Sequence, residues 1–332
     1  RWLRCRCMIG FVDPTSRHSA PVFYGWIVVA AAFAVMFFGF GSAYSFAPVF
    51  EVLQRQFAAT RGEVSLVFSL AGGLYFLLGA VSGPLADRVG PRWVSFAGML
   101  VVGAGLLLAS QARTLLQLYC AYGFGIGFGI GLAYVPAIGA VQRWFVRRRG
   151  FASGLAVAGI GLGTLFVPPV ATWLIAHLDW RGAYQALGVA AILCGGGAAL
   201  FIENSPARRG LLPDGEPMTA TNRPGGGVTP PGMRLGAALR SRPFRMLYLA
   251  SITVSLGLFI PFVHLVPYAQ DHRIPPGQAV WLLSLIGIGS TIGRFAFGSV
   301  ADRLGRRRSL ALTYLGMGLM LFWWLASGTF WQ

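Results

Sequence analysis

Long runs of hydrophobic residues, separated by short polar turns, dominate the chain. A bilayer core about 30 Å thick needs roughly 20 mostly apolar helical residues, so each of these runs can cross a membrane. Glycine-rich runs such as 123–131 stay helical in lipid, because the backbone there can bond only to itself. We therefore predict an all-α integral membrane protein with nine membrane-spanning helices, at residues 24–48, 62–86, 93–110, 115–141, 150–176, 182–203, 244–269, 277–302 and 308–329.

The overall composition agrees with a chain that lives in lipid. Hydrophobic residues make up 55% of the sequence and charged residues 11%, whereas soluble domains carry about 25% charged residues. The four cysteines have no spacing typical of zinc or redox sites, and no nucleophile, base and orienting group share a plausible site. The sequence therefore predicts neither an enzyme nor a bound cofactor.

The formal net charge of +17 would indicate a nucleic-acid partner in a soluble protein. All 27 cationic residues are arginines, and 21 of them fall in the N-terminal tail, the segment 204–243 with its edge, and the turns after the second, fourth and eighth predicted helices. Five fall in the opposite turns. The positive-inside rule then places the N-terminus in the cytoplasm. Membrane topology explains the charge, with the lipid bilayer as partner and no nucleic acid.

One charged turn occurs twice in the chain. Residues 83–92 read GPLADRVGPR and residues 298–307 read GSVADRLGRR, with six of ten positions identical at an offset of 215 residues. The copies follow the second and eighth predicted helices, so the offset matches a duplication of six helices plus a linker. The expected parts are a cytoplasmic tail at 1–23, a six-helix half at 24–203, a linker at 204–243 and a partial second half at 244–332.

Two further expectations follow from this division. The linker is rich in Pro and Gly, so we expect it to be flexible. A second half as long as the first would extend beyond residue 332, so the sequence reads as truncated after the ninth helix, with helices ten to twelve outside it.

The repeated turn is predicted to act as a conformational latch at the cytoplasmic surface. Its glycines permit a sharp reversal and close helix packing, and its acid can bond to an arginine or face the positive end of a helix in the other half. An ordinary positive-inside turn is the alternative for one copy, but two copies in register favour a duplicated transporter. The latch residues are Gly83, Asp87, Arg88, Gly90 and Arg92, and in the second copy Gly298, Asp302, Arg303, Gly305, Arg306 and Arg307.

These motif residues carry a resemblance to a known family. The chain resembles the major facilitator superfamily, whose signature G-x-x-x-D-R-x-G-R-R follows helices two and eight; Pro91 replaces one arginine in the first copy. Residues 24–33, 143–169 and 264–307 are similar to the bacterial monocarboxylate porter and oxalate/formate antiporter branch. The resemblance implies a bundle of two six-helix halves, transport of small organic anions by alternating access, and a bacterial inner membrane.

Arg294 is the one arginine that lies well inside a predicted helix, about 12 Å before Asp302 along the helix axis. A charge at that depth costs several kcal/mol unless it faces a cavity or a partner, and a guanidinium binds a carboxylate through two parallel hydrogen bonds. An arginine that snorkels to the cytoplasmic surface is the alternative. In the resembled branch an arginine in helix eight binds the substrate carboxylate, which favours the substrate role.

The ion that is coupled to transport is left open by the sequence. Proton-coupled members of the family have an Asp four residues before this arginine, and here that position is Ser290. A counter-anion, or a proton carried by an acid in helices outside the chain, therefore stays open as the coupling partner.

Four other residues are candidates for the substrate site. His264 lies near two prolines that can free backbone carbonyls toward a cavity, and it can hydrogen-bond a carboxylate or carry a proton. Tyr44, Tyr75 and Tyr134 fall inside predicted helices and are weaker candidates. For all four the alternative is a packing or interfacial role.

Two other functions compete with anion transport. Drug antiporters of the superfamily carry G-x8-G-x3-G-P; Gly150, Gly159 and Gly163 have that spacing, but Thr164 stands where Pro is expected. The glycine spacing alone is typical of helix packing. A membrane sensor that kept the fold and lost the transport cycle is the second alternative.

Overall fold

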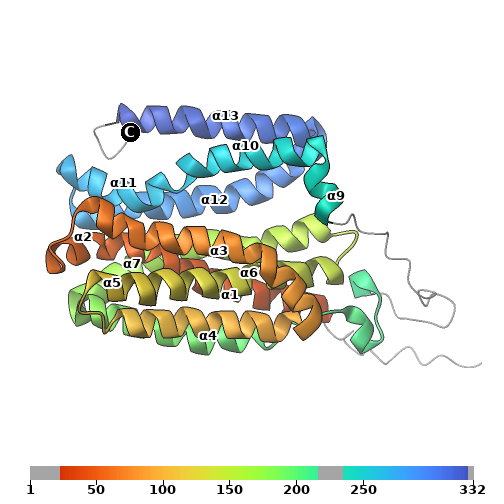
Figure 1. The fold of residues 1–332 in the computed structure, drawn as a ribbon. Coiled ribbons are helices and arrows are strands. Elements are labelled where there is room, and N and C mark those ends of the chain that lie inside the picture. The colour runs from red at the N-terminus through yellow and green to blue at the C-terminus, as the bar shows by residue number, and fades with distance from the viewer. Residues whose placement is uncertain (1–22, 216–234, 328–332) are drawn as a thin grey trace, which may run out of the picture.

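The helices form two groups that lie side by side (Figure 1). The structure is a computed structural model that describes residues 23–215 and 235–327. For some residues in those ranges only the backbone is described and not the side chain. They are residues 235, 236, 238, 276, 280, 283, 295–303 and 306.

The first group runs from α1 to α8. Its longer helices are α1 (Tyr24–Tyr44), α2 (Phe46–Gln56), α3 (Arg61–Val89), α4 (Pro91–Ala109), α6 (Gly125–Trp144) and α7 (Arg149–Ala190). Its short segments are α5 (Leu115–Leu118), the π-helices η1 (Tyr119–Phe124) and η2 (Ala191–Gly196), and α8 (Gly197–Ala199). Helix α7 bends at Asp179, where φ is 66°, so it contains parts of two predicted membrane crossings.

The second group follows the predicted linker. It consists of α9 (Leu235–Arg240), α10 (Arg242–Leu258), α11 (Ile260–Asp271), α12 (Pro276–Leu304) and α13 (Arg306–Leu325). The predicted helix at 244–269 is thus interrupted at Phe259. Pro261 explains the interruption, because proline lacks the N–H that a helix requires and its ring crowds the preceding turn.

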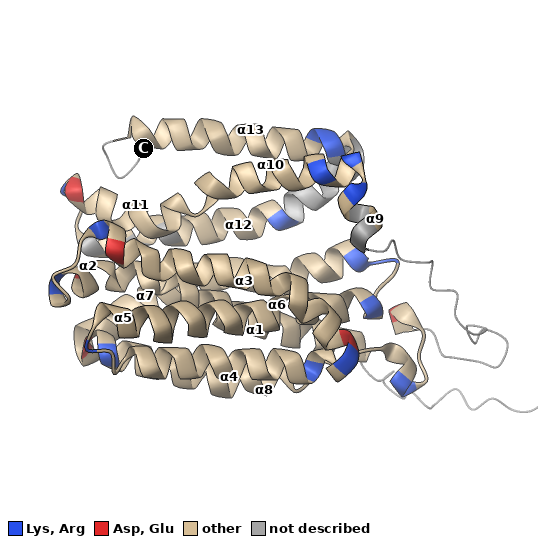
Figure 2. Cartoon of the chain, in the orientation of Figure 1, with Lys and Arg blue, Asp and Glu red and all other residues tan. Residues whose placement is uncertain are grey.

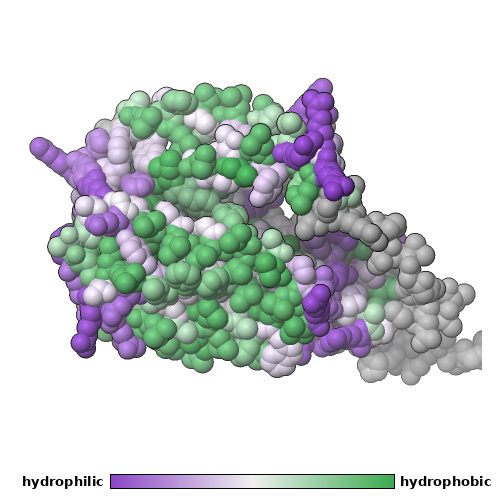
Figure 3. All heavy atoms as spheres, viewed as in Figure 1, coloured by the Kyte–Doolittle hydropathy of each residue, from purple (hydrophilic) through white to green (hydrophobic). Residues whose placement is uncertain are grey.

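Charge and hydropathy divide the molecule into an apolar middle and two polar ends. Charged residues gather at the ends of the helices (Figure 2), and hydrophobic surface covers the region between them (Figure 3). This distribution is typical of a protein that crosses a membrane several times. Among the described residues, the helical stretches long and apolar enough to do so are the following six: Tyr24–Gln56, Arg61–Val89, Pro91–Ala109, Leu115–Trp144, Arg149–Ala199 and Arg242–Asp271.

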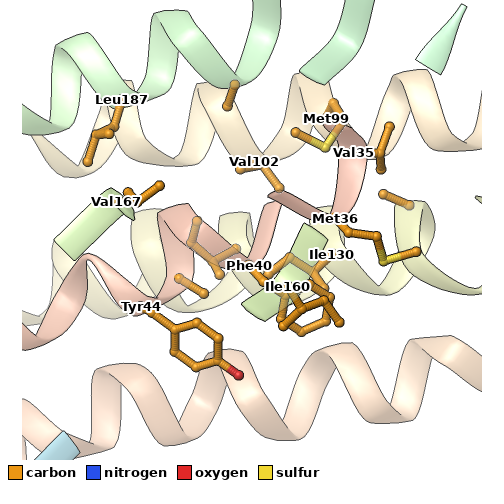
Figure 4. Close-up of a cluster of buried hydrophobic side chains, with 14 of the residues drawn as sticks. Val35, Met36, Phe40, Tyr44, Met99, Val102, Ile130, Ile160, Val167 and Leu187 are labelled. Carbon is orange, nitrogen blue, oxygen red and sulfur yellow. The ribbon is translucent and has the colours of Figure 1, made fainter. Parts of the chain in front are cut away.

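The first group has a dense core in which α1 and α7 lie against each other. Phe40, Ile130 and Ile160 are buried at its centre, and Tyr44 lies at its edge (Figure 4). A Cβ on Gly163 would lie 2.6 Å from the carbonyl oxygen of Phe37, which is closer than packed atoms allow. Gly163 therefore allows α7 to pack closely against α1. This agrees with the sequence analysis, which attributed the spacing of the glycines to helix packing.

The most extensive contacts between the two groups are those of α7 with α12 and of α2 with α11. The Ser284 hydroxyl donates a hydrogen bond to the carbonyl of Leu165 at 3.0 Å across the first of these contacts. At one end of the bundle, Arg61 donates two hydrogen bonds to the carboxylate of Asp271, at 2.7 and 2.8 Å. Both side chains are about half exposed, so this ion pair contributes at most about 1 kcal/mol.

The first residues of the predicted linker are ordered. They form the short helices η3 (Pro206–Arg209) and η4 (Pro213–Gly215). The Asp214 carboxylate accepts hydrogen bonds from the backbone N–H groups of Val146 at 3.1 Å and Arg147 at 2.9 Å, in the turn between α6 and α7. Residues 204–215 of the predicted linker thus contain short helices and contact the turn between α6 and α7, whereas 216–234 lie outside the described residues. The flexibility of the linker stays a prediction.

The docked carboxylate has a lowered pKa. Partial burial raises the pKa of Asp214, but the hydrogen bonds from the backbone of Arg147, Val146 and Arg148 outweigh it and lower the pKa below its usual value. The docking contact is therefore present at neutral pH, where the carboxylate is charged, and is lost as the pH falls through this lowered pKa.

Removing this carboxylate should release the start of the linker. We expect Asp214→Ala to increase tryptic cleavage after Arg208 and Arg209 severalfold at neutral pH, because two backbone donors lose their acceptor. Asp214→Asn keeps one oxygen acceptor and should give a smaller increase. The measurement is a time course of limited proteolysis on the purified protein, and equal cleavage rates for all three proteins would contradict the docking role.

Candidate functional site

The candidate site is centred on Arg294 in α12. The side chain is half-buried, and its Nη1 atom is fully buried without a hydrogen-bond partner among the described residues. The guanidinium is close enough to the phenols of Tyr44 and Tyr134, both in the first group, to interact electrostatically with each. Because an unpaired buried cation is costly, this arrangement suits an anion that would complete its hydrogen bonds.

The three predicted tyrosines lie around one aromatic side chain that the sequence analysis missed. The ring of Phe40 in α1 is 6.3 Å from that of Tyr44, 5.7 Å from Tyr75 and 5.6 Å from Tyr134, measured between ring centroids. The structure thus brings these three candidates together. Phe40 lies one helical turn before Tyr44, and that spacing is the signal that could have identified it.

Two phenylalanines of the second group face this cluster. The rings of Tyr44 and Phe262 are stacked at 4.4 Å, and the rings of Tyr75 and Phe259 are 6.4 Å apart. The cavity left between the rings measures about 10 Å³, which holds about one water molecule. This cavity is therefore too small for an organic anion in the conformation that the structure describes.

His264 is not part of this arrangement. It lies in α11, with its ring 6.4 Å from that of Phe50, and it lines a larger cavity of about 660 Å³ between α3, α10 and α11. This cavity adjoins the small one, because Phe68, Gly72 and Phe259 line both. Other polar residues that line this cavity are Ser65, Ser69, Ser251 and Ser255. The structure thus groups the tyrosine candidates with Arg294 and places His264 elsewhere.

The repeated turn has the backbone that the sequence predicts. Gly90 and Gly305 end α3 and α12 with φ of 101° and 86°, a left-handed conformation that favours glycine. Arg92 donates from Nε to the carbonyl of Ile202 at 3.2 Å, and Arg88 is exposed. In the second copy Arg307 is exposed, whereas the side-chain positions of Gly298, Asp302, Arg303 and Arg306 lie outside the described residues.

The acid of the first copy pairs within its own group of helices. Asp87 accepts a hydrogen bond from Nη1 of Arg143, at the end of α6, at 2.9 Å. Gly83, Asp87 and Arg143 line a cavity of about 300 Å³. A contact between Asp87 and the other half of the protein, which would act as a latch, remains a prediction. The pairing of Asp87 with Arg143 was not predicted from the sequence.

We expect Asp87→Asn to slow transport by up to about fivefold without changing the affinity for substrate by more than about twofold. An exposed ion pair contributes about 0.2–1 kcal/mol, and Asp87 follows Tyr75 of the aromatic cluster by 12 residues in α3, which is about 18 Å along the helix axis. Arg143→Gln should give the same loss. Glu51→Gln, which removes the comparable pair of Glu51 with Arg55, is the control and should be neutral; an equal fall in affinity in the Asp87 variant would indicate a substrate role instead.

The comparison with known proteins settles the family. The Major Facilitator Superfamily matches residues 26–332, which is nearly the whole chain. The chain belongs to the major facilitator superfamily. Its fold agrees with this: a bacterial homologue of the human lysosomal transporter Spinster superimposes with a TM-score of 0.67 at 17% identity, over 87% of this chain and 64% of that one.

Relatives within the superfamily include two mammalian proteins. Monocarboxylate transporter 13 of Bos taurus is 32% identical over 306 residues, which cover 90% of this chain and 67% of that protein. Monocarboxylate transporter 3 of Rattus norvegicus is 32% identical over 286 residues, covering 86% and 56%. The chain thus spans between about half and two thirds of these relatives. Their names agree with the expected branch and with a protein that is not an enzyme.

This superfamily member is an integral, multi-pass membrane protein, as predicted. The expected bacterial inner membrane is not supported, because these two relatives are animal proteins.

Proposed function

We propose that the protein is a secondary transporter of small organic anions, mono- or dicarboxylates, in which Arg294 binds the substrate carboxylate. The observation that carries this proposal is the buried Nη1 atom of Arg294, which has no hydrogen-bond partner among the described residues, on a guanidinium within electrostatic range of the phenols of Tyr44 and Tyr134. A guanidinium and two phenols all donate hydrogen bonds, so together they fit a carboxylate.

The names of the relatives support the same class of substrate. Two proteins that share 32% identity with this chain are called monocarboxylate transporters. The aromatic rings of Phe40, Phe259 and Phe262 around the tyrosines offer apolar surface, which suits the short carbon skeleton of a small organic acid.

The proposed mechanism is alternating access between the two groups of helices. Arg294 belongs to the second group and both tyrosines to the first, so a bound anion bridges the two. The arginine distribution supports a cytoplasmic N-terminus and nine crossings in this chain. The Arg61–Asp271 pair then joins the groups at the outer end, opposite the repeated turns.

The proposed coupling partner is a counter-anion. Ser290 stands one helical turn before Arg294, and none of the ten acidic residues of the sequence lies deep within a predicted helix. Without a carboxylate to carry a proton beside the site, exchange of one anion for another is the simplest cycle that these residues support.

Counterflow in proteoliposomes tests the function. Vesicles that contain the purified protein are loaded with unlabelled lactate, pyruvate, oxalate or formate and then given the labelled anion outside. We expect labelled anion to accumulate for at least one member of this panel, without a requirement for a pH gradient. Binding without counterflow would favour a sensor, and movement of cationic drugs but of no anion would favour drug efflux.

A further inference from the structure

The helix that carries Tyr44 is interrupted within the candidate membrane-spanning stretch Tyr24–Gln56. Helix α1 ends at Tyr44 and α2 begins at Phe46, with Ser45 between them. Pro48 explains the position of the break, because it lacks the N–H that would bond to the carbonyl of Tyr44 and its ring crowds that carbonyl. In hydrocarbon, backbone groups freed by such a break need other partners inside the protein.

Two buried hydroxyls bond to carbonyls of the broken turn. Ser45 donates from Oγ to the carbonyl of Ser42 at 2.7 Å, within the same turn. Tyr122 donates from its hydroxyl to the carbonyl of Ala43, also at 2.7 Å, from a segment 79 residues away in the sequence. Tyr122 is therefore a partner that fixes this turn from outside α1.

Tyr122 is packed among other aromatic rings and is shielded from solvent. Its side chain is fully buried, and its ring lies 5.3 Å from that of Phe46 and 5.7 Å from that of Tyr184. It belongs to η1, a π-helical segment between α5 and α6. Wide turns of this kind are frequent at functional sites, where they change the direction of a side chain.

We infer that Tyr122 is a positioning residue for the anion site: its hydroxyl fixes the turn at Ala43 and so holds Tyr44 in place beside Arg294. This inference rests on the proposed function of Arg294 and Tyr44. Tyr44 directly follows Ala43, and it is 6% exposed with its ring stacked on Phe262. A shift of the Ala43 carbonyl is therefore expected to move the Tyr44 phenol, which interacts electrostatically with the guanidinium.

The first test needs no substrate. Tyr122→Phe removes only the hydroxyl, so the ring packing is kept and amide hydrogen exchange of peptides spanning residues 40–50 should become severalfold faster. Tyr184→Phe is the matched control, because the Tyr184 hydroxyl is equally buried but has no hydrogen-bond partner among the described residues. Unchanged exchange in the Tyr122 variant, or the same change in both variants, would overturn the inference.

The second test separates positioning from general stability. With the anion of the counterflow panel that gives the strongest signal, Tyr122→Phe should raise the half-saturating concentration about two- to tenfold, as expected for one hydrogen bond, and leave the maximal rate near that of the parent protein. The same substitution in a Tyr44→Ala background should have less than about a twofold effect, because Tyr122 acts through Tyr44.

The outcomes distinguish this inference from the proposed function. An additive loss in the Tyr44→Ala background would show that Tyr122 acts elsewhere and would overturn the inference alone. If Arg294→Ala leaves affinity unchanged, the proposed anion site fails, and the exchange measurement still decides whether the Tyr122 hydroxyl holds the broken turn.

Discussion

Replacing Arg294 by alanine is expected to weaken binding of the transported anion about ten- to a hundredfold. A charge-assisted hydrogen bond contributes about 1.5–3 kcal/mol, which corresponds to that range. The variant should still insert into the membrane, because it removes a charge from α12 instead of adding one. The measurement is the half-saturating concentration in counterflow, with the amount of protein in the membrane determined in parallel.

Two further variants make this test specific. Arg294→Lys keeps the positive charge but loses the planar guanidinium that can make two parallel hydrogen bonds to a carboxylate. Compared with Arg294→Ala, it should therefore restore only part of the affinity, and more of it for small monocarboxylates than for dicarboxylates. Arg245→Ala removes an exposed arginine of α10 in the same group of helices and should be neutral. Unchanged affinity in the Arg294→Ala protein at normal membrane level would leave this arginine as a packing or snorkelling residue.

A valine at Gly287 is expected to reduce transport by at least about fivefold. Gly287 in α12 faces α7 so closely that a Cβ would lie 2.6 Å from the carbonyl oxygen of Gly161 and 2.7 Å from the amide nitrogen of Leu165. These are backbone atoms, which cannot turn aside as a side chain can. Overpacking costs about 1–3 kcal/mol, equivalent to roughly five- to 150-fold in an equilibrium between two packed states.

The same helix offers the control for this prediction. Apart from the nearby backbone of its own helix, no atom of the described residues lies within 4 Å of where a Cβ on Gly289 would stand. Gly289→Val therefore changes helix propensity equally without this clash. We expect the Gly289 variant to transport normally and the Gly287 variant to show reduced counterflow and a lower unfolding temperature in detergent. Equal behaviour of the two variants would mean that the contact between α7 and α12 does not limit the cycle.

The ends of helices could be predicted where local chemistry marks them. The predicted helix at 62–86 corresponds to α3, which begins after a capping box of Thr60 and Glu63 and ends at Gly90, where φ is positive. These signals lie within a few residues of the ends they mark. The break after Tyr44 has an equally local cause in Pro48, but a proline inside a membrane helix is often tolerated, so the sequence alone did not identify it.

Partners across the fold could not be predicted in the same way. Arg294 was identified because a charge inside an apolar run is costly unless it faces a cavity or a partner, and this holds whichever helices are its neighbours. The pairing of Asp87 with Arg143, and the separation of His264 from Arg294, depend on which helices are neighbours and how each is rotated. The spacing of hydrophobic residues indicates how a helix is rotated about its own axis only when one face is more apolar than the other. It gives little information for α1 and α13, which are apolar on every side.

The bend in α7 has a mechanical consequence. Only Asp179 departs from helical geometry between two membrane crossings, and its carboxylate accepts the backbone N–H groups of Arg181 and Gly182 at 2.7 and 2.9 Å. Arg181 in turn donates to the carbonyls of Ser110 and Ala112, just after α4. These bonds close the bend on itself and tie it to the segment that follows α4. Under the proposed alternating access, a displacement of α7 at its contact with α12 would therefore be passed through the bend to the end of α4.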